Sequence, residues 1–285
     1  MLLSTVIVGY WSRAPLLECL RSLGEQANDF AAETVVVDNA SGDGTLDAVA
    51  ESHPAVRRIA NSENVGYARA VNQGIAATTG EYVLVMNPDC ELRPGALVAL
   101  IDHLSRNPGV AIAGPRILNP DGSLEYSARS FPDHLTFLFN RYSLLTRWFP
   151  NNPYSRRYLL TDWDHASVRG VDWLSGACLM VRREAIARVG PMDEQFFMFN
   201  EDVDWCRRMK LAGWGVVYVP GAVVVHHVGA SRSRVASKVI FERHRGMIHY
   251  FHKHHPTNPV MQALADGAIL LRAGLMMTAN ALRPR

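Results

Sequence analysis

Residues 35–44 read VVVDNASGDG, a run of valines that ends at Asp38 and continues into a glycine-rich turn. A short, continuous apolar run is typical of a strand that is buried on both faces of a parallel sheet. Ligands of such sheets bind beyond the carboxyl ends of the strands. The Asp38 carboxylate could therefore accept a hydrogen bond from a pyrimidine ring, or it could simply close an Asx-type turn between the strand and the next helix.

Three more polar groups follow apolar runs in the same way: Asp89, the pair Glu201-Asp202, and His226. If these runs meet at one sheet edge, all four groups face one shared crevice. A divalent cation that bridges a diphosphate needs few protein ligands, because phosphate oxygens and waters complete its coordination. Asp89, with Asn87 beside it, could be such a ligand, although an Asn-Pro pair also commonly starts a turn.

Glu201 and Asp202 lie in the first turn of an expected helix, with Asn200 at its N-cap. Acidic residues there stabilise a helix through its dipole, which explains them without any catalytic role. The dipole does not explain the apolar run FFMF (196–199) just before them. We expect that run to be buried and to hold the carboxylates at the mouth of an apolar pocket, where a carboxylate is suited to act as a general base.

Two other segments could contribute to the same crevice. His226 leaves a strand toward it together with a second histidine, although an isolated buried histidine is more often structural. Asn64 begins NVGYARAVN (64–72), which opens a helix after a short loop. Helix N-termini attract phosphate, so Arg69 and Asn72 could line a nucleotide site. The small residues of this segment equally permit close packing of the helix on a sheet.

Strand and helix patterns alternate along the first half of the chain, which predicts parallel βαβ units. The expected strands are residues 3–9, 34–37, 82–86, 110–113, 177–181, 216–219 and 223–225, and the expected helices are 15–23, a short one after 45, 67–79, 94–105, 183–189 and 201–212. Residues 123–170 break this rhythm with aromatic residues, arginines and prolines. They are predicted to be a loop-rich insertion over the active face.

The composition is that of a globular protein, with 48% apolar and 20% charged residues among 285. Four cysteines lie far apart, which argues against a disulfide framework or a zinc site and suits a reducing compartment such as the cytoplasm. The N-terminus lacks a basic region before its apolar run, so it is expected to be a first strand and not a signal peptide.

Charge is distributed unevenly along the chain. Residues 226–285 contain nine Lys and Arg against two Asp and Glu, a balance of +7, which leaves −5 for residues 1–225 out of a total of +2. The basic part favours an anionic surface or a phosphate-bearing partner. From about Val260 the tail is rich in Ala, Leu and Met but is interrupted by Asp266 and Arg272. It is predicted to be an interfacial helix at a membrane, or else a helix that packs on the catalytic domain or mediates a homodimer.

Taken in order, these motifs resemble those of glycosyltransferase family 2, whose members have the GT-A fold. The resemblance covers about Val6 to Ser231. Its pieces are VDNASGDGT (37–45), NVGYARAVN (64–72), NPD (87–89), GACLMVRR (176–183), GPMDEQFFMFNEDVDWCR (190–207) and PGAVVVH (220–226). Within the family, NPDGSLEYSAR (119–129) and VDWLSG (171–176) are similar to bacterial rhamnosyltransferases that use dTDP-L-rhamnose.

The resemblance implies an α/β catalytic domain over 1–231, with a Rossmann-like nucleotide-binding sheet and flanking helices, and a basic, helical C-terminal extension over 232–285. Asp38 would bind the pyrimidine, and Asn64, Arg69, Asn72 and Asn87 would line the nucleotide site. Asp89 and His226 would hold a divalent cation, Mg²⁺ or Mn²⁺. Asp202, with Glu201 beside it, would be the catalytic base. Asn87 departs from the family, whose motif has an acid in that position.

The activity that the resemblance implies is inverting transfer of one sugar to a glycan or polyprenyl-diphosphate-linked acceptor in cell-envelope polysaccharide synthesis. No nucleic-acid partner is expected, and the location would be the cytoplasm or the inner face of its membrane. The sequence lacks the Gln-x-x-Arg-Trp signature and the membrane spans of processive synthases. A UDP-hexose donor is the nearest alternative. A nucleotidyltransferase is disfavoured because residues 9–13 match a phosphate-binding loop poorly, and Glu201, Asp202 and His226 disfavour a non-catalytic binding module.

Overall fold

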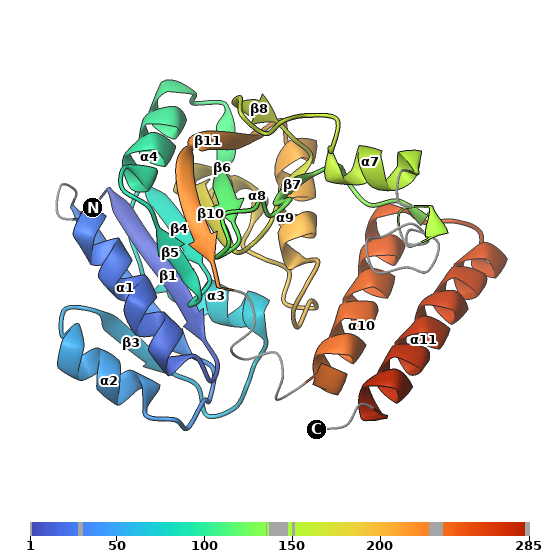
Figure 1. Cartoon of the computed structure of the whole chain (residues 1–285), viewed down its shortest axis with the longest axis horizontal. Helices are drawn as coiled ribbons and strands as arrows, with labels where there is room; N and C mark the ends of the chain where they lie inside the picture. Colours follow the sequence, from blue (N-terminus) through green and yellow to red (C-terminus); the bar gives the residue numbers. More distant parts are fainter. Residues whose placement is uncertain are drawn as a thin grey trace.

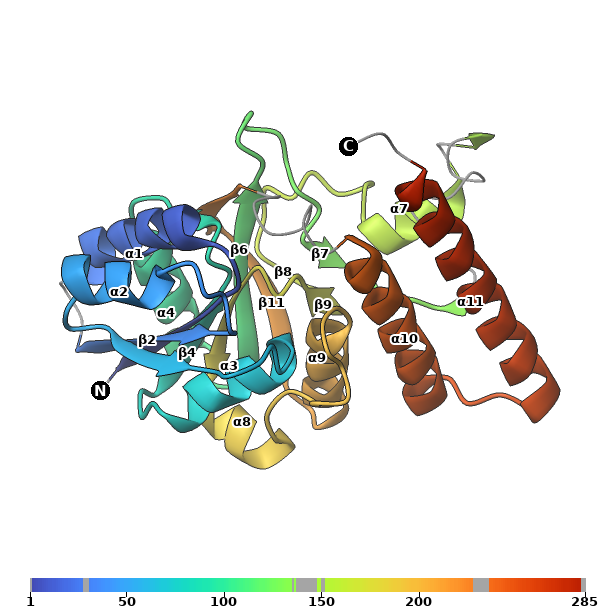
Figure 2. The ribbon, with the colours of Figure 1, turned by 90° about the horizontal axis from the view of Figure 1, so that it is seen from below.

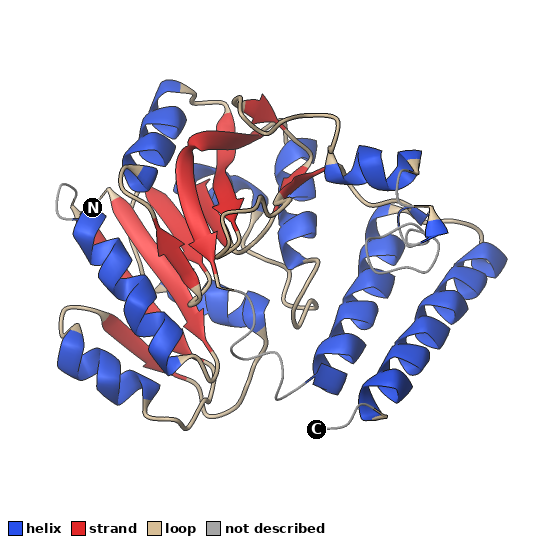
Figure 3. Cartoon of the chain, viewed as in Figure 1, coloured by secondary structure: helices blue, strands red, loops and turns tan. Residues whose placement is uncertain are grey.

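The computed structural model describes residues 2–27, 31–134, 136, 148–149, 152–227 and 236–282. A central sheet carries helices on both faces, and a pair of long helices lies beside it (Figure 1). The view at a right angle separates these layers (Figure 2), and Figure 3 shows the strands together, flanked by helices.

The first four strands are parallel: β1 (Leu3–Gly9), β2 (Ala32–Asp38), β3 (Arg57–Ala60) and β4 (Tyr82–Met86). Helices α1 (Arg13–Ala27), α2 (Thr45–Ser52) and α3 (Tyr67–Ala76) connect them. The predicted βαβ pattern is thereby confirmed for this half. The sequence pattern does not predict β3, because this edge strand is largely exposed and has no continuous apolar run.

The second half of the sheet is mixed. It contains β5 (Cys90–Leu92), β6 (Val110–Leu118), β10 (Cys178–Arg182) and β11 (Gly215–His226), with α4 (Ala96–Arg106) between the first two. The strand order is β3-β2-β1-β4-β10-β6-β11-β5. The parallel pattern predicted for the first half of the chain does not continue here, since β10 runs antiparallel to both β4 and β6 and β5 runs antiparallel to β11.

Strand β11 replaces the two short strands expected at 216–219 and 223–225. It pairs with β6 along its length, with a shift of register between Val219 and Val223. Pro220 lies in that shift and has no N–H to donate, so the ladder is interrupted there without ending the strand.

Two apolar clusters cover the two faces of the sheet. Along β1, Val6 and Val8 belong to one cluster while Leu3 and Ile7 belong to the other, as the alternation of side chains in a strand requires. Helices α1, α2 and α4 pack on the second face. The first face is covered by α3, α8 (Arg183–Val189) and α9 (Glu201–Leu211).

The segment 123–170 carries little regular structure among its described residues. These include β7 (Ala128–Arg129), α7 (Pro153–Leu159) and β8 (Arg169–Gly170), and β7 pairs with β9 (Trp173–Leu174). The segment follows the turn predicted at Asn119, whose carbonyl accepts the Gly122 N–H at 2.9 Å. Part of the predicted insertion, including 137–147, lies outside the described residues.

Helices α10 (Ala236–His254) and α11 (Pro259–Ala281) form a hairpin at one side of the molecule (Figures 1 and 2). Tyr250 and Phe251 of α10 are buried in the core cluster that also contains residues of α9, so α10 is attached to the part of the chain that forms the sheet. By length and composition α11 could cross a membrane, and 11% of its apolar stretch is buried in the structure.

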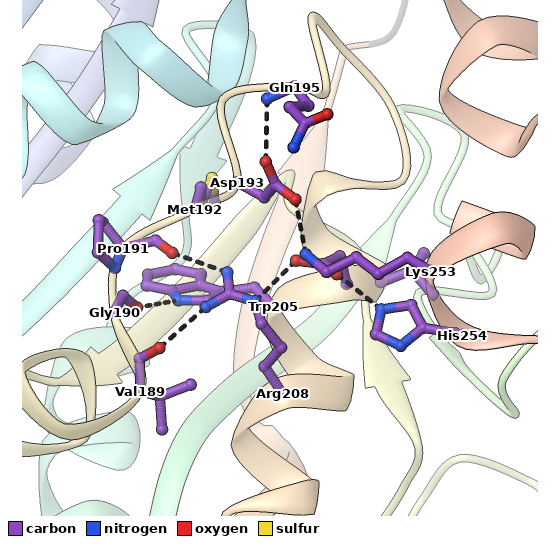
Figure 4. A network of polar contacts seen from close by, with 12 residues as sticks. Val189, Gly190, Pro191, Met192, Asp193, Gln195, Trp205, Arg208, Lys253 and His254 are labelled. Atoms are coloured by element: carbon purple, nitrogen blue, oxygen red, sulfur yellow. Dashed lines mark hydrogen bonds and ion pairs between the residues drawn. The ribbon is translucent and has the colours of Figure 1, made fainter. Parts of the chain in front are cut away.

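An ionic network also joins α10 to α9 (Figure 4). The Asp204 carboxylate is fully buried and lies 2.8 Å from Arg208, 2.9 Å from Lys253 and 2.7 Å from His254. Lys253 also lies 2.6 Å from Asp193, in the loop before α9. The residues that open α9 are therefore held in position partly from the C-terminal hairpin.

Candidate active site

A cavity of about 240 Å³ opens where β1, β2, β4 and β11 end and where α9 begins. Its lining includes residues at or shortly after these strand ends and at the helix start, namely Tyr10, Asn39, Asn87, Asp89, His226, Glu201 and Asp202. The structure thus brings together Asn87, Asp89, Glu201, Asp202 and His226 as the sequence predicts. Asn64 also lines the cavity.

His226 is held between two carboxylates. Its Nε2 lies 3.2 Å from Asp89 Oδ1, and its Nδ1 lies 2.9 Å from Glu125 Oε2. Burial alone would lower the pKa of this imidazole, but the neighbouring carboxylates of Asp89 and Glu125 outweigh it and raise the pKa to about 9. Glu125 lies within the motif at 119–129 and is a site residue to which the sequence pattern gives no role.

Asp89 and His226 offer donors that fit a divalent cation. His226 Nε2 is buried and makes no hydrogen bond of good geometry, and one ligand atom each from Asp89, Cys90 and His226 lie within 4.8 Å of one another. A carboxylate on the far nitrogen of a histidine is the arrangement that orients a metal-binding imidazole, and Glu125 supplies it. Cys90 is a poor ligand, because burial raises its pKa well above the ordinary value and its thiol lies 3.3 Å from the Ala177 carbonyl.

Asp202 lies at the start of α9, and two backbone amides fix its carboxylate. Its Oδ2 accepts from the Gly176 N–H at 2.8 Å, and its Oδ1 accepts from the Val203 N–H at 2.9 Å. Burial raises the pKa of Asp202, although these amides and the Arg129 charge act in the opposite direction. Burial followed by the charge of Asp202 raises the pKa of Glu201 well above its ordinary value.

The backbone before these carboxylates is strained. Phe199 and Asn200 have φ values of 66° and 69°, in the left-handed region that non-glycine residues rarely adopt. Asn200 occupies the N-cap position, but its side chain makes no capping hydrogen bond, which corrects the expected role. Of the FFMF run, Phe196 is buried in the core, whereas Phe197 to Phe199 are half-buried and line the cavity.

Asp38 closes an Asx-type turn, which is one of the two alternatives that its sequence context allows. Its carboxylate accepts from both the N–H and the hydroxyl of Ser41, and it is not among the residues that line the cavity. The next residue, Asn39, does line the cavity and donates to Asn64 Oδ1 at 3.0 Å. A role of Asp38 in binding a base stays a prediction.

Arg69 and Asn72 lie away from the cavity that they are predicted to line. Asn72 donates to the Met192 carbonyl at 2.9 Å and accepts from the Met192 N–H at 3.0 Å. Arg69 is exposed and lies 3.7 Å from Glu194. Both side chains therefore fasten α3 to the loop before α9, because they project from the side of the helix that faces that loop.

The N-terminus of α3 is occupied by the chain itself. The Tyr67 N–H donates to the Phe197 carbonyl at 2.6 Å. Gly66 has a φ of 91°, and a Cβ there would lie 2.7 Å from the same carbonyl oxygen. The glycine thus permits this close approach, and the structure favours the packing alternative over phosphate binding at this helix start.

A second cavity of about 270 Å³ shares Glu125, Ser175, Phe199 and Asp202 with the first. Its other walls include Arg129 from the segment 123–170, Trp173 of β9, and side chains of α10 and α11. Asp202 therefore faces two adjoining spaces, one at the strand ends and one beneath the hairpin. This division suits a reaction between two substrates.

Comparison with known proteins identifies relatives of the whole chain. The family model described as "Glycosyl transferase family 2" matches residues 4–189. The N-acetylglucosaminyl-diphospho-decaprenol L-rhamnosyltransferase of Mycobacterium tuberculosis (strain ATCC 25618 / H37Rv) is 36% identical over 294 residues, which cover 98% of this chain and 94% of that protein. The low-salt glycan biosynthesis hexosyltransferase Agl10 of Haloferax volcanii is 29% identical, with 82% of this chain and 70% of Agl10 covered.

A solved structure confirms the fold. The mannosyltransferase PcManGT from Pyrobaculum calidifontis, in complex with GDP-Man and Mn²⁺, superposes with a TM-score of 0.59 at 20% identity. The match covers 98% of this chain and 72% of that one. At this identity the likeness establishes the α/β, GT-A type architecture and not the substrate.

Proposed function

The chain belongs to glycosyltransferase family 2, and on that premise we propose that it transfers one L-rhamnosyl group from dTDP-L-rhamnose to a lipid-linked sugar diphosphate. The mycobacterial relative, whose name specifies rhamnosyl transfer to a decaprenol-diphosphate-linked sugar, supports both the sugar and the class of acceptor. The observation that carries the proposal is the position of Asp202, which lines two adjoining cavities. A base that serves two substrates has to stand between them.

In this proposal the cavity at the strand ends holds the donor and the one beneath the hairpin holds the acceptor. Asp202 removes the proton from an acceptor hydroxyl, whose oxygen then attacks the anomeric carbon from the face opposite the nucleotide. The bond to the diphosphate breaks as the new glycosidic bond forms, so the configuration inverts. The Gly176 and Val203 amides hold the carboxylate in a fixed orientation for this step.

Asp89 and His226 would hold a divalent cation, Mg²⁺ or Mn²⁺, at the donor diphosphate. When bound, the ion supplies positive charge that stabilises the leaving nucleoside diphosphate. Glu125 orients the His226 ring from its other nitrogen, and Asn87 and Asn39 line the same cavity. The structurally similar PcManGT, which was solved with both GDP-Man and Mn²⁺, supports this assignment.

We also propose that the enzyme acts as a peripheral protein at the cytoplasmic face of the membrane, where a lipid-linked acceptor would be found. Exposed leucines of α11 support this, among them Leu264, Leu271 and Leu275, each more than 60% exposed. An apolar helix face of this kind binds at a bilayer interface without spanning it.

The test is release of nucleoside diphosphate from a panel of donors, with and without EDTA, in the presence of a prenyl-diphospho-N-acetylglucosamine. We expect dTDP-L-rhamnose to be the best donor and EDTA to abolish turnover. Preference for a UDP-hexose would replace the proposed donor with the nearest alternative. Full activity after exhaustive chelation would remove the cation from the mechanism.

A further inference from the structure

The two charged residues of α11, Asp266 and Arg272, both turn away from solvent. Asp266 lies 2.8 Å from His252 of α10, so it fastens the two helices of the hairpin together. Arg272 lines the second cavity, the one that Asp202 also faces. Although leucines of α11 are exposed to solvent, Arg272 of the same helix places a cation in the wall of this cavity.

Arg243 of α10 reaches the same cavity. Its guanidinium lies 4.4 Å above the centre of the Phe199 ring, next to the strained backbone that leads into α9. Burial and the neighbouring charge of Arg243 lower the pKa of Arg272. Two guanidinium groups that line one partly buried cavity can bind a multivalent anion together through charge-assisted hydrogen bonds.

A third arginine, Arg129, also lines this cavity. Arg129 lies with its guanidinium 5.0 Å from the centre of the Trp173 ring, and its charge acts on the Asp202 carboxylate. The cavity is therefore lined both by the proposed base and by Arg243 and Arg272 of the hairpin. An acceptor that combines a sugar hydroxyl with an anionic group would fit this lining.

We propose that Arg243 and Arg272 bind the diphosphate of the lipid-linked acceptor and thereby bring its sugar hydroxyl to Asp202. This inference rests on the proposed function and adds to it the residues that recognise the acceptor. The sugar lies toward Asp202, the diphosphate lies between the two hairpin arginines, and the lipid continues along α11 toward its apolar outer face. Arg243 and Arg272 are positioning residues in this scheme, while Asp202 is the catalytic one.

The same two arginines could instead bind the phosphate of an ordinary anionic phospholipid. The cavity favours the acceptor, because it shares Asp202, Glu125 and Ser175 with the donor cavity and so belongs to the reacting centre. The experiment has to distinguish these two sources of phosphate.

The experiment compares two soluble acceptors with full-length enzyme and saturating donor. One is a short-chain prenyl-diphospho-N-acetylglucosamine, and the other is an alkyl N-acetylglucosaminide without the diphosphate. Arg272→Gln should raise KM for the first acceptor by roughly 10- to 100-fold, the size expected for one lost charge-assisted hydrogen bond. It should leave KM for the second acceptor and for the donor unchanged, and Arg272→Lys should restore part of the loss.

Arg245→Gln is the matched control. Arg245 lies on α10 two residues from Arg243, but its side chain is half-exposed, lies 3.2 Å from the buried Glu242 and lines neither of the two cavities. We expect it to behave as wild type with both acceptors. Unchanged donor KM in Arg272→Gln also shows that the variant is folded.

The outcomes separate this inference from the function on which it rests. A wild-type enzyme that does not use the diphosphate acceptor would overturn both. A wild type that uses it, with the same KM in Arg272→Gln or an equal loss with both acceptors, would overturn the arginine site alone. Normal kinetics with weaker binding of Arg272→Gln to phosphatidylglycerol vesicles would assign the site to a phospholipid headgroup and overturn it as well.

Discussion

Asp202 is the residue whose chemistry is most sharply constrained, because backbone amides fix both of its oxygens and burial raises its pKa. Asp202→Asn should lower kcat by at least about 100-fold, since a positioned general base contributes roughly 10²–10⁴-fold. Donor binding should change little, because the carboxylate serves the acceptor hydroxyl. Kinetics together with nucleoside diphosphate titration measure both quantities. Near-normal turnover would move the role of base to Glu201.

The pH dependence of the same residue follows from the direction of its pKa. The base acts only when ionised, and its pKa is raised above that of an ordinary aspartate. The rate should therefore fall on acidification at a higher pH than a solvent-exposed aspartate would give, and it should recover fully when the pH is raised again. A profile of kcat/KM against pH, with donor at saturation, checks this. An acidic limb at the ordinary aspartate value would contradict the assignment.

The cation site allows a separate prediction at Asp89 and His226. Asp89→Ala should remove both the dependence on divalent cation and the tight binding of nucleoside diphosphate. His226→Ala should show a milder form of the same defect, because a metal-bound imidazole adds no charge to the site while Asp89 contributes charge. Calorimetric titration with Mn²⁺ and nucleoside diphosphate measures this. If Asp89→Ala binds both as wild type does, Asp89 is no more than a turn residue.

Sequence reasoning identifies the residues of this site that follow apolar runs, and it misses those that reach the site from elsewhere. Asp89, Asp202 and His226 end or begin regular elements, where the pattern can find them. Glu125 contacts His226 from 101 positions away, and Arg272 comes from a helix whose periodicity indicates only an apolar face. Arg69 and Asn72 have the residue types of a nucleotide site, but their helix turns them toward residues 192–194.

At the scale of elements, the apolar pattern predicts burial well and strand direction poorly. The valine runs locate β1, β2 and β4, and their alternation with helices implies that they are parallel. Strand β10 has an equally apolar pattern, yet it enters the sheet antiparallel between two other strands. A buried run looks the same in either direction, so only its connections decide, and the connection before β10 is the irregular segment 123–170.

The ionic contact between α9 and α10 depends on Asp204. Burial raises the pKa of this carboxyl, but hydrogen bonds from His254, Lys253 and Arg208 outweigh it and lower the pKa to about 2. Because the folded pKa is below the unfolded one, the stabilisation is present above about pH 4 and is lost as the pH falls toward 2. A difference of this size corresponds to roughly 2 kcal/mol.

We therefore expect the free energy of unfolding to fall between pH 4 and 2 more steeply in wild type than in Asp204→Asn. The variant should already be less stable at pH 7, because three basic side chains lose their buried partner. Urea unfolding at several pH values measures this. Asp102→Asn, which removes an exposed pair with Arg106 on α4, is the control and should change stability by less than about 1 kcal/mol. Equal effects of the two substitutions would contradict a special role for Asp204.

On the scale of the whole molecule, the hairpin combines an attachment to the catalytic part with an apolar surface that faces outward. One stripe of exposed positions recurs with the helical period on α11 and ends at its C-cap; it consists of Val260, Leu264, Gly267, Leu271, Leu275, Thr278 and Leu282. None of them is charged, whereas the charged residues of the helix face inward. When a surface helix is exposed only to water, its charged residues face the solvent and its apolar residues face the protein.

This surface predicts binding to anionic lipid vesicles in a flotation assay. Binding should be strong at low salt and weaker as salt rises, since basic residues near an anionic leaflet each contribute on the order of 1 kcal/mol. Replacing Leu264, Leu271 and Leu275 with serine should abolish most of it, because an inserted leucine contributes about 1.5–3 kcal/mol. Leu211→Ser, at an equally exposed leucine of α9, should float as wild type does. If the intact protein stays with the soluble fraction at every salt concentration, and light scattering shows a dimer that the triple variant loses, α11 is a dimer interface and the acceptor is reached without docking on the bilayer.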